Sequence, residues 1–251
     1  MGSALLTGLL AANWAPIDDL VVSEVDAAQR ARLEEAHPGL TVVGGPVEAE
    51  DILLAVKPDV AEPVLLALAA NGARRVLSIV AGISTARLEA VMPAGSVVVR
   101  AMPNTPSLVG AGVAGLSGGM GATSADLAWA EGILSAVGAV VRLPERHLDA
   151  VTGVSGSGPA YVFLMAEAMI EAGVTAGLSR EVSKQLVVAT LLGSARMLDE
   201  TGLEPSELRA AVTSPGGTTA AAVRTLEFKA VRSAFIEAVA AAVERSRQMG
   251  R

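Results

Sequence analysis

The chain has 251 residues, of which 51% are hydrophobic, so it can bury a substantial core in one large domain or two of ordinary size. It contains no cysteine and two histidines, which excludes disulfide frameworks, cysteine nucleophiles and thiolate zinc sites, and argues against a histidine-rich metal centre. The formal net charge of −7 and the 2% share of aromatic residues disfavour nucleic acid and anionic membranes as partners.

The N-terminus carries no basic region before its apolar residues and no small-residue cleavage site, so no secretory signal is expected. The longest uncharged run, from Ala101 to Ala125, is interrupted by prolines, glycines and serines, which indicates loop and strand rather than a membrane span. We therefore expect a cytoplasmic enzyme or binding protein.

The first part of the chain alternates short β-rich runs with helical patterns. The main runs are continuously apolar, which predicts strands buried on both faces of a parallel sheet. With the intervening helices, they predict βα units wound into a Rossmann-like layer. The expected strands are 20–23, 41–43, 52–56, 75–80 and 96–100, with weaker candidates at 112–116 and 139–142, and the expected helices are 26–37, 60–70, 84–91 and 125–136.

After Pro144 the strand signals disappear, and Ala/Leu/Val patterns with charged residues at helical spacing predict an all-helical region. The expected fold is therefore α/β, with a dinucleotide-binding Rossmann-like domain over residues 1–146 and an all-α domain over 147–251. The helices expected in the second domain are 159–172, 179–201, 204–212, 218–227 and 230–249.

The chain begins inside the Rossmann pattern. Gly2 and Ser3, followed by an apolar helix, look like the last glycine of a dinucleotide fingerprint and the helix that faces the pyrophosphate. The strand and glycine turn that should precede them are missing, which predicts a hole in the sheet, and we favour a truncated start over a real loss. A surface helix behind a short tail is the alternative. Glu24 stands where an acidic residue binds a ribose hydroxyl, although a solvated glutamate would look the same.

Five segments are too specific in glycine, proline and hydroxyl residues to be explained by packing alone. In this order and at this spacing they resemble the pyrroline-5-carboxylate reductase family, and the resemblance covers essentially the whole chain. It implies reduction of L-1-pyrroline-5-carboxylate to L-proline, with NADPH as the cofactor and NADH as a possible one. The segments are 54–58, 78–83, 100–106, 149–161 and 212–219.

Three of these segments follow predicted strands. In doubly wound sheets the ligand lies beyond the carboxyl ends of the strands, so these residues are candidates for the cofactor site. A capping lysine and a turn-forming asparagine are the alternative interpretations for Lys57 and Asn104. The resemblance implies that the first of these loops contacts the cofactor. The candidates are Ala55, Val56, Lys57, Pro58, Ala81, Gly82, Met102 and Asn104.

The segment from Ser214 to Thr219 predicts a substrate site. Its glycines expose backbone N–H groups where a helix begins, and this forms an anion nest suited to a carboxylate. A capping loop between two helices is the alternative. By resemblance, the hydroxyl of Thr219 binds the ring nitrogen as the catalytic group, and Glu145 lies near cofactor and substrate, where a surface ion pair is the alternative. The substrate candidates are Ser214, Gly217, Thr218, Thr219 and Glu145.

Two other functions are compatible with parts of the sequence. A hydroxyacid dehydrogenase shares the domain pattern, but Val188 stands four residues after Lys184, where that family's pattern expects asparagine. A non-catalytic metabolite-binding homologue would fit a real loss of the first strand. Serine-hydrolase chemistry fails, because Ser157 stands where the nucleophile elbow requires glycine. The resemblance also implies that residues 147–251 form a substrate and dimerisation domain, in a homodimer or a larger ring of dimers. No metal is expected.

Overall fold

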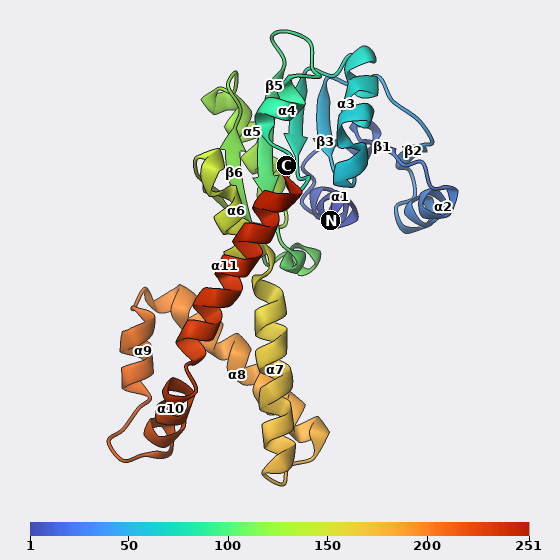
Figure 1. Cartoon of the computed structure of the whole chain (residues 1–251). Helices are drawn as coiled ribbons and strands as arrows, with labels where there is room; N and C mark the ends of the chain where they lie inside the picture. Colours follow the sequence, from blue (N-terminus) through green and yellow to red (C-terminus); the bar gives the residue numbers. More distant parts are fainter. Residues whose placement is uncertain (251) are drawn as a thin grey trace. The chain divides into compact units, whose positions relative to one another are not determined.

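The structure is a computed structural model that describes residues 1–250 (Figure 1). By the contacts between residues the chain forms two compact units. The sheet unit comprises residues 1–157 and the end of the last helix from Ala241 onward, and the helical unit comprises Gly158–Ala240. The functional division into 1–146 and 147–251 stays a prediction.

The sheet unit contains the Rossmann-like strands expected from the sequence, including the two weaker candidates. The strands fall into two sheets, and β1 pairs with β2 alone among the described residues. The order β3-β4-β5-β6-β7 makes the larger sheet. The strands are β1 (Val21–Ser23), β2 (Thr41–Val43), β3 (Asp51–Leu54), β4 (Arg75–Ser78), β5 (Val97–Met102), β6 (Gly112–Gly118) and β7 (Gly138–Arg142).

Alternate residues of the central strands are buried on opposite faces of the larger sheet. Val76 and Val98 pack in one apolar cluster with helices α3 and α4, whereas Leu77 and Val99 pack in another with α1 and α5. This confirms the prediction from the continuous apolar runs for the central strands, because a strand covered on both faces has no solvated side. The prediction is wrong for β1 and β2, whose residues are exposed or half-buried because these strands pair only with each other in the described part of the chain. The helices of this unit are α1 (Gly2–Ala11), α2 (Ala27–Ala36), α3 (Ala61–Ala70), α4 (Thr85–Glu89), α5 (Ser124–Ser135) and α6 (Leu148–Val151).

The main runs pair in parallel, as expected, whereas β6, one of the weaker strand candidates, makes the larger sheet mixed. Strands β3, β4 and β5 are parallel, but β6 runs antiparallel to β5. The reason is the short connection, residues 103–111, since a parallel crossover needs about a dozen residues or more. Strand β7 is again parallel to its neighbour β6, and helix α5 forms the crossover between them.

The break between the two sheets lies where the sequence predicts a hole. Neither β1 nor β2 pairs with β3 among the described residues, and in Figure 1 the two short strands stand to one side of the larger sheet. Side chains join them to the rest instead, because Leu6 of α1 packs with Leu33 and Leu40 around this pair of strands.

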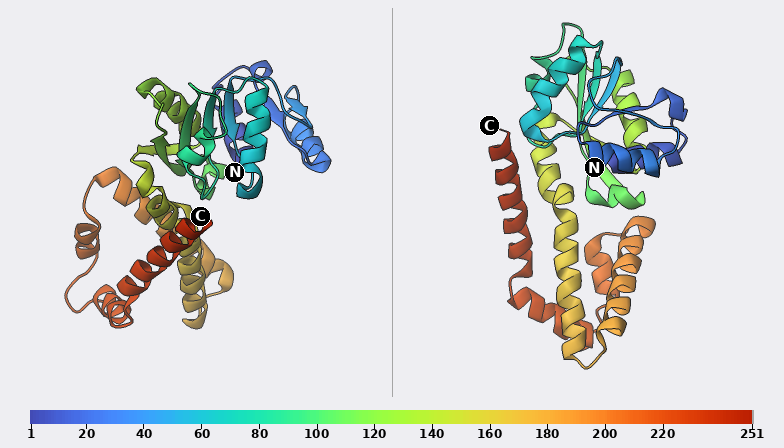
Figure 2. Two further views of the ribbon diagram at one scale, coloured as in Figure 1. Left: turned by 45° about the horizontal axis from the view of Figure 1, so that its top comes forward. Right: turned by 90° about the vertical axis from the view of Figure 1, so that its right-hand side faces the viewer.

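The helical unit consists of long helices within a few residues of their predicted bounds. Helices α7 and α8 pack side by side (Figure 2), and at their contact the Ser183 hydroxyl donates to the Ile170 carbonyl at 2.8 Å. Ser179 caps α8 through its hydroxyl, and Gly202 ends the helix in the left-handed conformation. The helices are α7 (Gly158–Thr175), α8 (Arg180–Thr201), α9 (Pro205–Ala211), α10 (Thr218–Phe228) and α11 (Val231–Met249).

Among the described residues, no helix is both long enough and apolar enough to cross a membrane.

Candidate functional site

The predicted cofactor loops of the sheet unit gather at one edge of the larger sheet. Because β3, β4 and β5 are parallel, the segments that follow them leave from the same edge. Ala55 and Lys57 are exposed there after β3, while Ala81, Gly82 and Met102 are half-buried after the next two strands. The topology therefore brings these three predicted segments to one edge.

The start of helix α1 lies beside the end of β3. A Cβ atom on Gly2 would approach the Cβ of Ala55 to 3.0 Å, so a side chain at this position would crowd the neighbouring strand. Helix α1 has no side-chain cap, and Ser3 in its first turn is exposed. Free first-turn N–H groups and a bare glycine are what the pyrophosphate of a dinucleotide requires. The described part of this edge thus fits such a cofactor.

Glu24 follows β1, and its carboxylate is turned back on its own loop. It accepts a hydrogen bond from the Asp26 N–H at 2.9 Å, and Asp26 in turn caps α2. The guanidinium of Arg30 reaches the same turn and donates to the carbonyls of Glu24 and Val25, each at 2.9 Å. A positive charge therefore stands beside the predicted ribose position, which the sequence spacing alone did not indicate.

Asn104 is 7% exposed and engaged at both ends of its amide. Its Nδ2 donates to the Ser155 carbonyl at 3.1 Å, and its Oδ1 accepts from the Val113 N–H at 2.9 Å. The side chain thereby ties the end of β5 to the start of β6 and to the glycine-serine motif. Of the two roles open from the sequence, this geometry favours the structural one, and the predicted cofactor contact stays untested.

The glycine-serine motif forms a π-helix over Thr152–Gly156, an element that is frequent at functional sites. Gly156 leaves room for the side chain of Met102, whose Cε would lie 3.0 Å from a Cβ at that glycine. The hydroxyl of Ser155 donates to the Val151 carbonyl at 3.0 Å, so it is used within the helix. Two predicted motifs, around Met102 and around Ser155, are therefore packed together.

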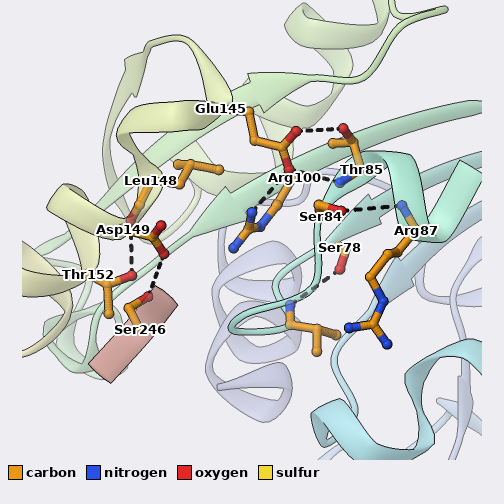
Figure 3. Close-up of polar contacts among 11 residues, drawn as sticks. Ser78, Ser84, Thr85, Arg87, Arg100, Glu145, Leu148, Asp149, Thr152 and Ser246 are labelled. Atoms are coloured by element: carbon orange, nitrogen blue, oxygen red, sulfur yellow. Dashed lines mark hydrogen bonds and ion pairs between the residues drawn. The ribbon is translucent and has the colours of Figure 1, made fainter. Parts of the chain in front are cut away.

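Glu145 is the centre of a polar cluster of three residues (Figure 3). Its Oε1 accepts from the Thr85 N–H at 2.8 Å and from Arg100 Nη1 at 3.0 Å, and its Oε2 accepts from the Thr85 hydroxyl at 2.7 Å. Burial raises the pKa of the Glu145 carboxyl, but the hydrogen bonds from Thr85 and Arg100 outweigh it, so the pKa is lowered from its ordinary value. The carboxylate is ionised and has partners on both oxygens.

Sequence reasoning did not assign Thr85 or Arg100 to the site, although Arg100 is the first residue of the 100–106 segment. Arg100 lies in the middle of the apolar strand β5, and its side chain is 11% exposed. A charge in a buried strand needs a partner, and that is the signal that could have identified the cluster. The partner lies 45 residues away in the sequence, which spacing arguments do not reach.

The end of helix α11 belongs to the sheet unit and covers the loop after β4. The Ser246 hydroxyl donates to the Asp149 carboxylate at 2.7 Å. Gly82 has a φ of +79°, and a Cβ there would come 3.1 Å from the carbonyl of Met249. Glycine is therefore required at this position both for its backbone conformation and for the close approach of the helix end.

The predicted substrate segment lies in the helical unit. Gly216 has a φ of +71°, and Gly217 is the N-cap of α10 without a side-chain cap. A Cβ on Gly217 would lie 2.5 Å from Ser214 Oγ, so the turn is tight. Thr218 and Thr219 form the first helical turn, where uncapped N–H groups favour an anion.

No group of three or more histidine, cysteine, aspartate or glutamate residues that could hold a metal ion occurs within residues 1–250.

Comparison with known proteins covers nearly the whole length of the chain. Residues 145–249 match the family model for pyrroline-5-carboxylate reductase dimerisation. The pyrroline-5-carboxylate reductase of Synechocystis sp. is 45% identical over 256 residues, which span 100% of this chain and 95% of that protein. The enzyme of Mycobacterium tuberculosis is also 45% identical, over 99% of this chain and 93% of its own.

Solved structures agree. A pyrroline-5-carboxylate reductase from Coxiella burnetii superimposes with a TM-score of 0.91 at 34% identity, covering 100% of this chain and 95% of its own. The Plasmodium falciparum pyrroline carboxylate reductase with NADP bound gives a TM-score of 0.87 at 32% identity, with the same coverage. The chain therefore belongs to the pyrroline-5-carboxylate reductase family, and it contains that family's dimerisation region.

Proposed function

We propose that the chain reduces L-1-pyrroline-5-carboxylate to L-proline with NADPH, or with NADH, as the last step of proline synthesis in the cytoplasm. The observation that carries this proposal is the uncapped glycine turn before α10, followed by Thr219, in a chain related over its full length to such reductases. The same relationship favours imine reduction over the hydroxyacid dehydrogenase alternative.

The cofactor is proposed to lie along the strand-end edge of the sheet unit. Gly2 and Ser3 at the start of α1 would hold the pyrophosphate, and Glu24 would bind the adenosine ribose. The loops after β3, β4 and β5 would line the nicotinamide half. When bound, this cofactor supplies the hydride. Support comes from the topology and from the absence of a side chain at Gly2, where a Cβ would lie 3.0 Å from that of Ala55. The remaining proposed contacts are Val56, Lys57, Pro58, Ala81, Gly82, Met102 and Asn104.

The substrate is proposed to bind at the turn before α10. The N–H groups around Gly217 and Thr218 would hold its carboxylate, with Ser214 supporting the turn. The Thr219 hydroxyl would hydrogen-bond the ring nitrogen and keep it oriented as it becomes an amine. Because Glu145 already accepts three hydrogen bonds from Thr85 and Arg100, we assign it an indirect role through the loop after β4 and no direct contact with the substrate.

The active form is proposed to be a homodimer or a larger ring of dimers. The match of residues 145–249 to a dimerisation region supports the homo-oligomer. Exposed apolar side chains on the helices of that region, such as Phe163 at 62% and Leu164 at 67%, supply a surface that a second copy would cover.

Replacement of the catalytic candidate tests the reaction. Thr219→Ala removes a preorganised donor of a kind worth about 2.7–4 kcal/mol in the transition state, so the turnover number should fall about 100- to 1,000-fold. Turnover is followed by NADPH absorbance with pyrroline-5-carboxylate. Thr225→Ala is the matched control, since Thr225 lies on the same helix and its hydroxyl donates to the Ala221 carbonyl at 3.1 Å. Unchanged turnover of Thr219→Ala would overturn the assignment.

Two assays separate the alternatives. Activity with 3-hydroxy acids in place of pyrroline-5-carboxylate would support a hydroxyacid dehydrogenase. Absence of dinucleotide binding in calorimetric titration, together with absence of turnover, would support a non-catalytic homologue.

A further inference from the structure

The loop between β4 and α4, residues 79–84, is fixed at both ends and in the middle. At its start the Val80 N–H donates to the hydroxyl of buried Ser78 at 3.3 Å. In its middle, Gly82 packs against the backbone of Met249. At its end, Thr85 opens helix α4 and is held by Glu145 (Figure 3). The loop conformation is therefore determined by groups outside the loop.

The attachment at Thr85 is the strongest of the three. Helix α4 has five residues, too few to be stable without tertiary contacts. Thr85 is 4% exposed, and both its N–H and its hydroxyl donate to the Glu145 carboxylate. A carboxylate at the first turn of a helix is also favoured by the helix dipole. Glu145 therefore helps to fix the start of α4, together with the N-cap Ser84, whose hydroxyl accepts from the Arg87 N–H at 3.3 Å.

Arg100 fixes Glu145 in turn. Its guanidinium projects from the central strand β5, and it donates to Glu145 Oε1 at 3.0 Å. Strand β5 is a rigid element, paired on both sides by β4 and β6. Through Glu145 and Thr85, Arg100 thus connects the start of α4 to the centre of the sheet.

We propose that Arg100, Glu145 and Thr85 are positioning residues that set the 79–84 loop for the nicotinamide half of the dinucleotide. This inference rests on the proposed function, which places Ala81 and Gly82 of that loop at the cofactor. The three residues act through the loop and make no contact with the cofactor themselves. The adenosine half, held by α1 and the turn after β1, is independent of them.

The experiment measures the binding of two probes to the full chain by calorimetric titration. NADPH contains the nicotinamide half, whereas adenosine 2′,5′-bisphosphate lacks it. In Thr85→Val and Arg100→Met the dissociation constant for NADPH should rise about tenfold, and that for the bisphosphate should stay within about twofold of the unsubstituted chain. In turnover assays the KM for NADPH should rise while the KM for pyrroline-5-carboxylate stays unchanged.

Two further variants separate positioning from general damage. Thr85→Ser keeps the hydroxyl and should restore NADPH affinity. Arg87→Met lies on the same helix and removes an exposed ion pair with Glu62, at 2.6 Å, that does not hold the loop. It should bind both probes normally. Thermal melting of each variant establishes that it is folded, and Glu145→Gln serves as the milder substitution if Arg100→Met is unfolded.

The outcomes are distinct. Equal losses for both probes, or unchanged NADPH affinity in Thr85→Val, would overturn the inference and leave the proposed function intact. An unsubstituted chain that binds the bisphosphate but neither binds NADPH nor reduces pyrroline-5-carboxylate would overturn both.

Discussion

The sheet unit and the helical unit bury their apolar residues in opposite ways. In the sheet unit, Leu77 and Val99 are fully buried between the sheet and its helices. In the helical unit, Val187 is the one buried apolar side chain among the described residues, while Leu164 and Ile236 are 67% and 70% exposed. The sheet unit therefore has a core of its own, whereas the helical unit displays apolar surface of a kind that marks protein interfaces.

Because of this difference, the two units gain their stability from different contacts. A unit with its own core owes its stability to packing within one chain, and that contribution does not change with protein concentration. A unit whose apolar side chains are exposed gains stability when a second copy covers them, and that contribution follows mass action. The match of residues 145–249 to a dimerisation region agrees with this division.

The largest effect is expected from charges placed on the apolar surface of α7. The double variant Phe163→Asp, Leu164→Asp should reduce the oligomer to single chains, because buried unpaired carboxylates oppose association. Light scattering coupled to size exclusion measures the mass. Leu66→Asp on α3 is the matched control, since Leu66 is 58% exposed in the sheet unit and its variant should keep the native mass. If the double variant kept the native mass, the exposed apolar side chains of α7 would not form the interface with a second copy.

A smaller effect is expected from truncating one leucine in each unit. Leu77→Ala should lower the free energy of unfolding by about 2–5 kcal/mol, as a cavity in a closed core does, at every protein concentration. Leu192→Ala on α8, where the side chain is 63% exposed, should destabilise in a way that depends on concentration. Denaturant unfolding at two protein concentrations measures both. If the loss of unfolding free energy in Leu77→Ala depended on protein concentration, the sheet unit would not be stabilised by its own core alone.

The smallest effect is expected on the melting temperature, when Glu145 and Glu227 are each replaced by glutamine and the pH is lowered. The pKa of Glu145 is lowered in the folded chain, so its stabilising contribution is present at neutral pH and is lost as the pH falls below about 4.5 through the folded pKa. Hydrogen bonds from Arg232 chiefly lower the pKa of Glu227, which is on the surface of the helical unit. Glu145→Gln should therefore lower the melting temperature at pH 7 and lose this effect toward pH 3.

Glu227→Gln provides the contrast in the same melting series. Its effect should have the same sign but be smaller, and added salt should remove it, because exposed ion pairs are screened. An effect of Glu145→Gln that also disappears in salt would show that its ion pair is not shielded by the sheet unit.

The positions of the elements could be predicted because the apolar runs of this chain are unambiguous. The run from Arg75 onward is apolar on both faces, and the structure buries both. The direction of β6 could not be predicted from its composition, since a short apolar run reads the same in either direction. The length of the connection from Met102 to Gly112 contains that information, because it is too short for a crossover.

The candidate site could be predicted where it depends on the ends of strands or helices, and not where it depends on long-range side-chain contacts. Lys57 and Ala81 follow from the rule that ligands bind beyond the carboxyl ends of parallel strands. The bond between Thr85 and Glu145 joins residues 60 positions apart, and nothing in the local sequence of either residue specifies the other. The same holds for the bond from the Asn104 amide to the Ser155 carbonyl, 51 positions away.

The return of α11 to the sheet unit has a topological consequence. The bond between Ser246 and Asp149 joins two residues 97 positions apart and so closes a loop of the chain, and the whole helical unit lies within that loop. The helical unit is thus an insertion between two segments of the sheet unit, since the chain returns to the sheet unit at Ala241. A protease that cuts one exposed turn inside it, such as the turn at Gly202, should leave two fragments that stay bound to each other through the sheet unit.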